Sequence, residues 1–311
     1  MSTTRREFLK RAVAAGLGVA AARLGWSGEP QTTEGQMPKR TAGKMGWNAS
    51  ILAFGMAEVP QNDPELCEKM LRRALDLGVN YIDTAPSYQG GAAERAIARV
   101  ADRRKEFFLA TKTLGRTKDA AAKDIAGSLE RMKVSVIDLL HLHAINDMRT
   151  LDTVLAKDGP IAALDEAKRA GKIRYIGITG HTRPEVILEA LKRYPFDAIL
   201  VPVSAADYHL NDFARETIPY ANKKGISVAG MKSLKGWQNA GRKAVSSREL
   251  LHYALSLPIA TLTCGMTTIQ QVEQNVRAAR AFRPLDTSQM DRLRAACKEW
   301  GTSQHLWWKR T

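Results

Sequence analysis

Residues 107–143 of the chain read FFLATKTLGRTKDAAAKDIAGSLERMKVSVIDLLHLH. The runs Phe107–Thr111 and Ile137–His143 are short and mostly apolar, as expected for strands that are buried on both faces. Between them, Asp119–Met132 has the apolar spacing of a helix. Parallel strands need a long crossover, usually a helix, so this stretch predicts one parallel β–α–β unit.

The same alternation continues on both sides of this unit. Further strands are expected at Ile51–Gly55, Asn80–Thr84, Ile173–Ile178, Asp197–Val203, Ile226–Met231 and Ala260–Gly265. Further helices are expected at Glu65–Leu77, Ala92–Ala101, Ile161–Ala170, Pro184–Arg193, Asp212–Lys224, Ser247–Leu257 and Ile269–Ala281. Eight such units predict an α/β protein with a (β/α)8 TIM barrel. A doubly wound sheet is the alternative, but no G-x-G-x-x-G follows the first strand.

Two further segments are expected to belong to this barrel domain, which would occupy residues 39–311. Arg40–Ser50 contains two glycines and predicts an N-terminal β-hairpin that plugs the barrel floor. At the other end, Ser288–Glu299 predicts a C-terminal helical tail, followed by Trp307 and Trp308. These tryptophans would either pack on the helix or cover the barrel mouth and stack on a sugar ring.

The first 25 residues resemble a twin-arginine (Tat) signal peptide. Arg5-Arg6 precedes a short run, Ala12–Ala22, that is apolar but rich in alanine and glycine. The run is shorter than the ~20 residues that span a bilayer, so no stable membrane insertion is expected. An amphipathic N-terminal helix is the alternative. The resemblance implies export through the Tat machinery to the periplasm or beyond, with residues 26–38 as a linker.

The net charge and the number of cysteines limit which partners and cofactors are expected. The net charge of +15 is partly carried by the N-terminal segment, and the rest alternates with acidic residues, as in Asp102–Glu106. No basic stripe with interleaved aromatic residues occurs, so no nucleic-acid partner is expected. The three cysteines, Cys67, Cys264 and Cys297, form no C-x-x-C pair, which argues against a disulfide scaffold or an iron–sulfur module.

Polar residues stand where the predicted strands end. In a TIM barrel the chemistry belongs to the C-terminal ends of the strands. Asp83 ends the second strand, Tyr88 follows it in the next loop, Lys112 ends the third and His143 ends the fourth. These four neighbouring groups are expected to form an active site.

These residues resemble the aldo-keto reductase superfamily over about residues 39–285. The matching stretches are Arg40–Gly55, Asn80–Tyr88 with Glu94, Leu109–Lys112, Asp138–His143 and Ile173–Ile178. By position, the resemblance implies a catalytic tetrad of Asp83, Tyr88, Lys112 and His143 that reduces an aldehyde or ketone, including sugars, with a nicotinamide hydride. Tyr88 would be the general acid, and Lys112 would lower the pKa of its phenol. Asp83 would orient Lys112, and His143 would donate a hydrogen bond to the carbonyl oxygen.

The resemblance also implies a cofactor site, with NADP(H) preferred over NAD(H). The implied contacts are Thr179, Met231, Lys232, Leu234, Gly265, Thr267, Gln271 and Asn275. A helix that begins after Thr268 would offer its free N–H groups to a phosphate. The chain departs from the family at Thr268 and Gln271, near which a basic residue is frequent, and at Leu200, where a glutamine is frequent. Thr179-Gly180 replaces a frequent Ser-Asn pair.

Two other functions stay open at this stage. His141 and His143 alternate on one strand and point the same way, so with His181 and His209 they suggest a metal-dependent TIM-barrel hydrolase. That enzyme class carries its H-x-H pair on the first strand, whereas this pair lies on the fourth. The departures in the cofactor site suggest a non-catalytic, redox-sensing module that binds a nicotinamide without turnover. The reductase interpretation requires no metal.

Overall fold

The structure, a computed structural model, describes residues 35–234 and 245–310. The expected signal peptide at residues 1–25 and most of the expected linker at residues 26–38 lie outside the described residues. Within the described ranges, no helix is long and apolar enough to cross a membrane.

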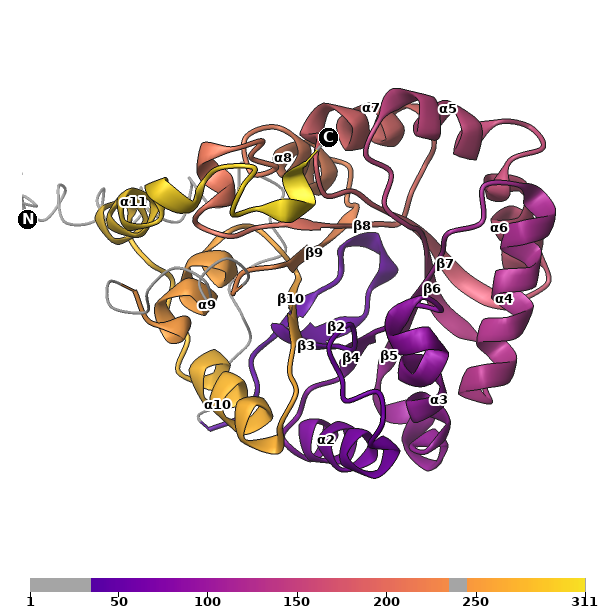
Figure 1. Cartoon of the computed structure of the whole chain (residues 1–311), viewed down its shortest axis with the longest axis horizontal. Helices are drawn as coiled ribbons and strands as arrows, with labels where there is room; N and C mark the ends of the chain where they lie inside the picture. Colours follow the sequence, from indigo (N-terminus) through magenta and orange to yellow (C-terminus); the bar gives the residue numbers. More distant parts are fainter. Residues whose placement is uncertain (1–34, 235–244, 311) are drawn as a thin grey trace, which may run out of the picture.

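Eight parallel strands form a closed barrel, in the order β10-β3-β4-β5-β6-β7-β8-β9, as the sequence predicts (Figure 1). Their bounds are β3 Leu52–Gly55, β4 Tyr81–Asp83, β5 Phe108–Thr113, β6 Ile137–Leu142, β7 Ile173–Thr179, β8 Ala198–Pro202, β9 Ser227–Met231 and β10 Thr261–Gly265. Every strand pairs with its neighbours in parallel, and β10 closes the ring against β3. The TIM barrel is therefore confirmed, and the doubly wound sheet is excluded.

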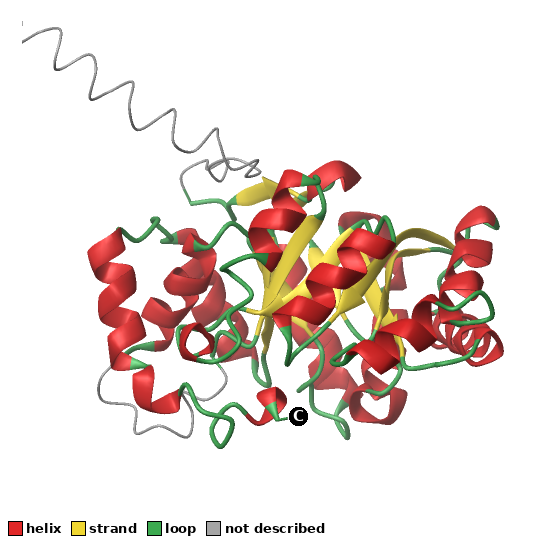
Figure 2. Ribbon diagram, turned by 90° about the horizontal axis from the view of Figure 1, so that it is seen from above, coloured by secondary structure: helices red, strands yellow, loops and turns green. Residues whose placement is uncertain are grey.

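Helices surround the barrel, which Figure 2 shows from a perpendicular direction. They are α2 Pro64–Asp76, α3 Ala92–Ala98, α4 Lys118–Met132, α5 Met148–Leu155, α6 Pro160–Arg169, α7 Pro184–Arg193, α8 Thr217–Lys223, α9 Ser247–Ser256, α10 Ile269–Arg280 and α11 Thr287–Ala296. Their apolar faces and the outward faces of the strands form the main hydrophobic core. Side-chain caps begin several of them, such as Ser246, which makes a capping box with Glu249.

Two helices differ from the expectation. Helix α5 was not predicted. It is a two-turn helix that Asp147 caps by accepting a hydrogen bond from the Thr150 amide. Helix α8 begins at Thr217 instead of Asp212. Pro219 explains the later start, because a proline ring is tolerated in the first turn of a helix but clashes further in. Asp212 also accepts a hydrogen bond from the Ala214 amide, which favours a turn over a helix there.

The predicted hairpin lies across the barrel (Figure 1). Its strands β1 Lys39–Thr41 and β2 Asn48–Ser50 pair antiparallel. Between them, a 3-10 turn over Gly43–Met45 inserts apolar side chains into a separate core inside the barrel. The other members of this inner core include Tyr81, Phe108, Leu139 and Ala198. Side chains therefore fill most of the barrel at the end where the hairpin lies.

Candidate active site

The four predicted catalytic side chains lie at the C-terminal ends of adjacent strands. Asp83 is the last residue of β4 and pairs with Ala110 of β5. Lys112 stands two residues further along β5, so it points to the same face of the sheet as Ala110. Tyr88 opens the 3-10 turn Tyr88–Gly91, and His143 directly follows β6.

The side chains of this tetrad contact one another. The Lys112 ammonium donates hydrogen bonds of 2.6 Å to Asp83 Oδ1 and 2.7 Å to the Thr84 carbonyl. It also lies 4.7 Å from the centre of the Tyr88 ring. The edge of the Tyr88 ring meets His143, with 6.1 Å between ring centres. The juxtaposition predicted from the sequence is therefore present.

Burial and neighbouring charges set the protonation states. Burial disfavours the Lys112 ammonium, but Asp83 and Tyr88 outweigh it, and the pKa of Lys112 is raised. Burial also raises the pKa of Asp83, and Lys112 opposes that shift. For Tyr88, burial raises the pKa of the phenol more than Lys112 lowers it. The expected lowering of the phenol pKa is thus present as one contribution, while the net shift is upward, and Tyr88 holds its proton at neutral pH.

His143 is a neutral imidazole. Burial, and then the Lys112 charge, lower its pKa to about 2. Its Nδ1 atom is buried and has no hydrogen-bond partner among the described residues. A neutral imidazole carries one N–H. If the proton is on Nε2, the Nε2–H can donate a hydrogen bond to a ligand.

His141 lies one layer deeper than His143. It is fully buried and pairs with Gly177 of β7, where an added Cβ would clash with the imidazole. Over residues 35–234 and 245–310, no group of three or more His, Cys, Asp or Glu side chains is placed to hold a metal ion. The metal-hydrolase alternative therefore has no geometric support in these parts of the chain.

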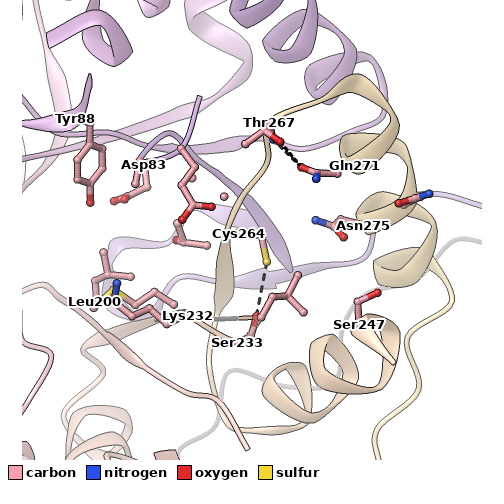
Figure 3. A pocket seen from close by; sticks show the side chains of 18 of the residues that line it. Asp83, Tyr88, Leu200, Lys232, Ser233, Ser247, Cys264, Thr267, Gln271 and Asn275 are labelled. Atoms are coloured by element: carbon pink, nitrogen blue, oxygen red, sulfur yellow. Dashed lines mark hydrogen bonds between the residues drawn. The ribbon is translucent and has the colours of Figure 1, made fainter. Parts of the chain in front are cut away.

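A pocket of about 420 Å³ opens in front of the tetrad. In Figure 3 it extends from Tyr88 and Asp83 on one side to Thr267, Gln271 and Asn275 on the other. Other lining residues are Gly55, Ala57, Glu58, His181, Leu200, Met231, Lys232, Ser233, Leu234, Ser247, Thr263, Cys264, Gly265 and Gln274. Lys112 and His143 are not part of this wall and stand beside Asp83 and Tyr88.

Seven of the eight predicted cofactor contacts line this pocket. They are Met231, Lys232, Leu234, Gly265, Thr267, Gln271 and Asn275. Thr179 lies elsewhere: it is fully buried, and its hydroxyl accepts a hydrogen bond of 2.8 Å from the Ala144 amide. Its side chain therefore supports the loop after β6 and is not placed to contact a ligand in the pocket.

The end of the pocket at α10 is lined largely by side chains without charge. Gly265 leaves the backbone bare there, and an added Cβ would stand 2.9 Å from Glu58 Oε2. Gln271 accepts hydrogen bonds from the amide and hydroxyl of Thr267. Hydroxyl and amide side chains of this kind suit ribose and base. Among the described lining residues, Lys232 is the only lysine or arginine.

Several residues of the wall were not predicted as site residues, among them Glu58 and Ser247. Glu58 follows β3 by three residues, so the strand-end rule that found Asp83 would also have found it. Ser247 is the first residue of α9, and only the folded loop before this helix brings it to the pocket.

The closed parallel barrel, with these four side chains at its mouth, places the protein in the TIM-barrel class. Residues 51–243 match the model of the Aldo/keto reductase family, and the chain belongs to that family. It is similar to L-galactose dehydrogenase of Arabidopsis thaliana, with 28% identity over 80% of this chain and 90% of that protein.

Solved structures agree with this assignment. The holo form of aldo-keto reductase AKR11C1 from Bacillus halodurans superposes with a TM-score of 0.73 and 25% identity, over 87% of this chain and all of that one. An aldo/keto reductase from Klebsiella pneumoniae, solved with NADP and acetate, superposes with a TM-score of 0.68 and 18% identity. That match covers 85% of this chain and 95% of the other, and it supports the fold alone.

Proposed function

We propose that this protein reduces an aldehyde or ketone to an alcohol with hydride from NAD(P)H. The observation that carries the proposal is the contact of Lys112 with both Asp83 and Tyr88 at one end of the pocket. A bound reduced nicotinamide supplies the hydride. The residues of the chain have to hold the carbonyl and deliver a proton to its oxygen.

Tyr88 is the group that delivers this proton. Its phenol is neutral at working pH, and the nearby Lys112 ammonium stabilises the phenolate that forms as the proton leaves. Lys112 is a positioning residue, which Asp83 holds charged and in place. His143 meets the edge of the Tyr88 ring and, as a neutral donor, would orient the carbonyl oxygen.

For the cofactor we keep the expectation of NADP(H) in preference to NAD(H). The family resemblance supports this preference. Six of the seven candidate contacts in the pocket wall, all except Lys232, would hold the dinucleotide. The neutral side chains at the α10 end offer no positive charge that would select for the extra phosphate of NADP(H). The ratio of kcat/KM with NADPH to kcat/KM with NADH measures the preference.

We propose that the substrate is a small aldehyde or ketone, a class that includes sugars. The similarity to a protein named L-galactose dehydrogenase supports a sugar. Trp307, which is 54% exposed, adds an aromatic surface of the kind on which a sugar ring can stack.

We also propose that the protein is exported by the Tat machinery to the periplasm or beyond. The support is the Arg5-Arg6 pair followed by the short run Ala12–Ala22. A folded protein with its cofactor bound is a suitable cargo for that route.

The deciding experiment is a steady-state assay with NADPH against a panel of aldehydes and keto-sugars. Substrate-dependent oxidation of NADPH that disappears in Tyr88→Phe supports the reductase. Tight NADPH binding without turnover of any carbonyl compound would instead favour the non-catalytic, redox-sensing module.

A further inference from the structure

The cation that faces the pocket is held by the C-terminal tail. Lys232 follows β9 and has a left-handed backbone, with φ of 65°, which is unusual for a residue other than glycine. Its ammonium lies 4.8 Å from the ring centre of Trp307 and 5.2 Å from that of Trp308. Cation–π contacts act within about 6 Å, so both indoles stabilise the charge.

The tail that supplies these indoles is anchored beneath them. Lys309 is buried and pairs with Asp207 at 3.3 Å, and it also donates 2.8 Å to the Asn211 carbonyl. The Trp308 indole N–H donates to the same carboxylate, and the Thr182 hydroxyl donates to the Trp308 carbonyl. The Trp308 indole is therefore held in place, and the Trp307 ring meets it edge-on with 5.8 Å between ring centres.

Lys232 has no carboxylate partner in the parts of the chain that the structure describes. Asp207, the acidic group that acts on it electrostatically, is already occupied. One Asp207 oxygen serves Lys309 and Trp308, and the other accepts from the amide and hydroxyl of Ser204. The charge of Lys232 thus remains available to a ligand in the pocket that it lines.

The region between Lys232 and the tetrad holds several cations, of which Lys112 is paired with Asp83 and Lys309 with Asp207. His181 lines the same pocket and lies 6.2 Å from His143, between ring centres. The charges that act on His181 come from Lys232, Lys112 and Lys309, all of them positive. Arg116 adds another cation beside His143, where it donates 2.7 Å to the backbone carbonyl. An anion placed here would be attracted by the Lys232 ammonium and the Arg116 guanidinium.

We infer that the substrate carries an anionic group, a carboxylate or a phosphate, which the Lys232 ammonium binds while the carbonyl lies at Tyr88. The inference rests on the proposed function, because it names the class of substrate for the same site. His181 lines the same pocket and can donate or accept a hydrogen bond, and the exposed Trp307 indole lies beside the Lys232 ammonium.

Matched pairs of aldehydes test this. We compare 4-carboxybenzaldehyde with 4-methylbenzaldehyde, and glyceraldehyde 3-phosphate with glyceraldehyde, at low ionic strength. The wild-type protein should prefer the charged member of at least one pair, and which pair distinguishes a carboxylate from a phosphate. Lys232→Met should lower kcat/KM for the preferred charged member by roughly 10- to 100-fold, mainly through KM, and change the neutral member little.

Two variants serve as controls. Lys232→Arg keeps a cation at the same position and should keep most of the preference for charge. Lys223→Met removes one charge from an exposed position on α8 and should leave both members of each pair unchanged. Equal losses for charged and neutral aldehydes in Lys232→Met, or no preference in the wild type, would overturn the inference.

The cofactor's own phosphates are the competing source of anionic groups. The Kd for NADPH, measured by quenching of tryptophan fluorescence, should be the same in Lys232→Met and wild type. If this Kd rises as much as the KM of the charged aldehyde, Lys232 serves the cofactor and the inference fails. If no aldehyde is turned over, the proposed function fails, and titration with benzoate decides the anion site separately. If the wild type binds benzoate and Lys232→Met does not, the anion site is supported. If the wild type does not bind benzoate, the anion site is refuted.

Discussion

The Lys112 ammonium lies 2.6 Å from Asp83 Oδ1, and both side chains are almost completely buried, at 1% and 4% exposure. Burying two charges is unfavourable unless they satisfy each other, and here the Thr84 carbonyl accepts a further proton of the ammonium. The ion pair therefore stabilises the fold and also belongs to the active site. Single and double variants can separate these two roles.

Replacing one partner of this pair should destabilise the protein. Lys112→Met leaves the Asp83 carboxyl buried without its cation, so the free energy of unfolding in urea should fall by about 3–5 kcal/mol. The double variant Asp83→Asn, Lys112→Met carries no buried charge and should recover much of that loss, while remaining inactive. A double variant as unstable as the sum of its single variants would show that the ion pair contributes no coupling.

Removing the Tyr88 hydroxyl should abolish chemistry and leave the fold intact. Tyr88→Phe is expected to lower kcat by roughly 10²- to 10⁴-fold, because general acid catalysis is lost. The Kd for NADPH and the melting temperature should stay close to those of the wild type. Tyr220→Phe, at a tyrosine on α8, provides the matched control. Normal turnover in Tyr88→Phe would exclude Tyr88 as the acid.

Anion binding at Lys232 should weaken as the pH rises through about 8. Burial lowers the pKa of Lys232 to about 8, so its ammonium is charged below that pH and neutral above it. Of the groups facing it, Asp207 stays paired with Lys309, Lys112 stays charged, and burial keeps His181 neutral with a pKa of about 3. The Kd for benzoate, measured between pH 6 and 10, should rise above that point in wild type. In Lys232→Arg it should stay flat, and parallel curves for the two proteins would contradict the assignment.

The close approach of His141 to Gly177 should make that glycine irreplaceable. In Gly177→Ala the new methyl group would overlap the imidazole, and overpacking of this kind costs about 1–3 kcal/mol. Combining it with His141→Ala should cost less than the two single changes together, since the overlap disappears. Gly127→Ala on α4 is the control, because its methyl group would meet only the end of the Arg131 side chain. Additive losses at Gly177 and His141 would refute the overlap.

The export proposal is tested by the arginine pair. Replacing Arg5 and Arg6 together by lysine should retain the protein in the cytoplasm, with the charge of the segment unchanged. Replacing Arg11 by lysine should leave export intact. Cell fractionation followed by immunoblotting distinguishes the outcomes, and continued export of the Arg5, Arg6 variant would contradict a twin-arginine route.

The sequence alone was sufficient for the barrel and its hairpin, because apolar runs and helical spacing recur eight times and local periodicity reports which faces are buried. It also located Asp83, Tyr88, Lys112 and His143, since each stands at or just beyond a strand end and parallel strands end at one mouth. Helix α5 was not predicted because it is short and depends on its Asp147 cap. The start of α8 was predicted too early because it depends on Pro219.

Only the tertiary structure decided what surrounds each polar group. The direction of the Tyr88 pKa shift follows from how deeply the phenol is buried, which periodicity does not report. Thr179 stands at a strand end like the others, yet its hydroxyl is engaged by Ala144 behind the pocket. Lys232 and Trp307 are 75 positions apart in the chain, and their contact exists because the closed barrel brings the C-terminal tail back over its mouth. Local pattern determines which elements form, whereas burial, charge balance and contacts between distant segments arise only when those elements pack.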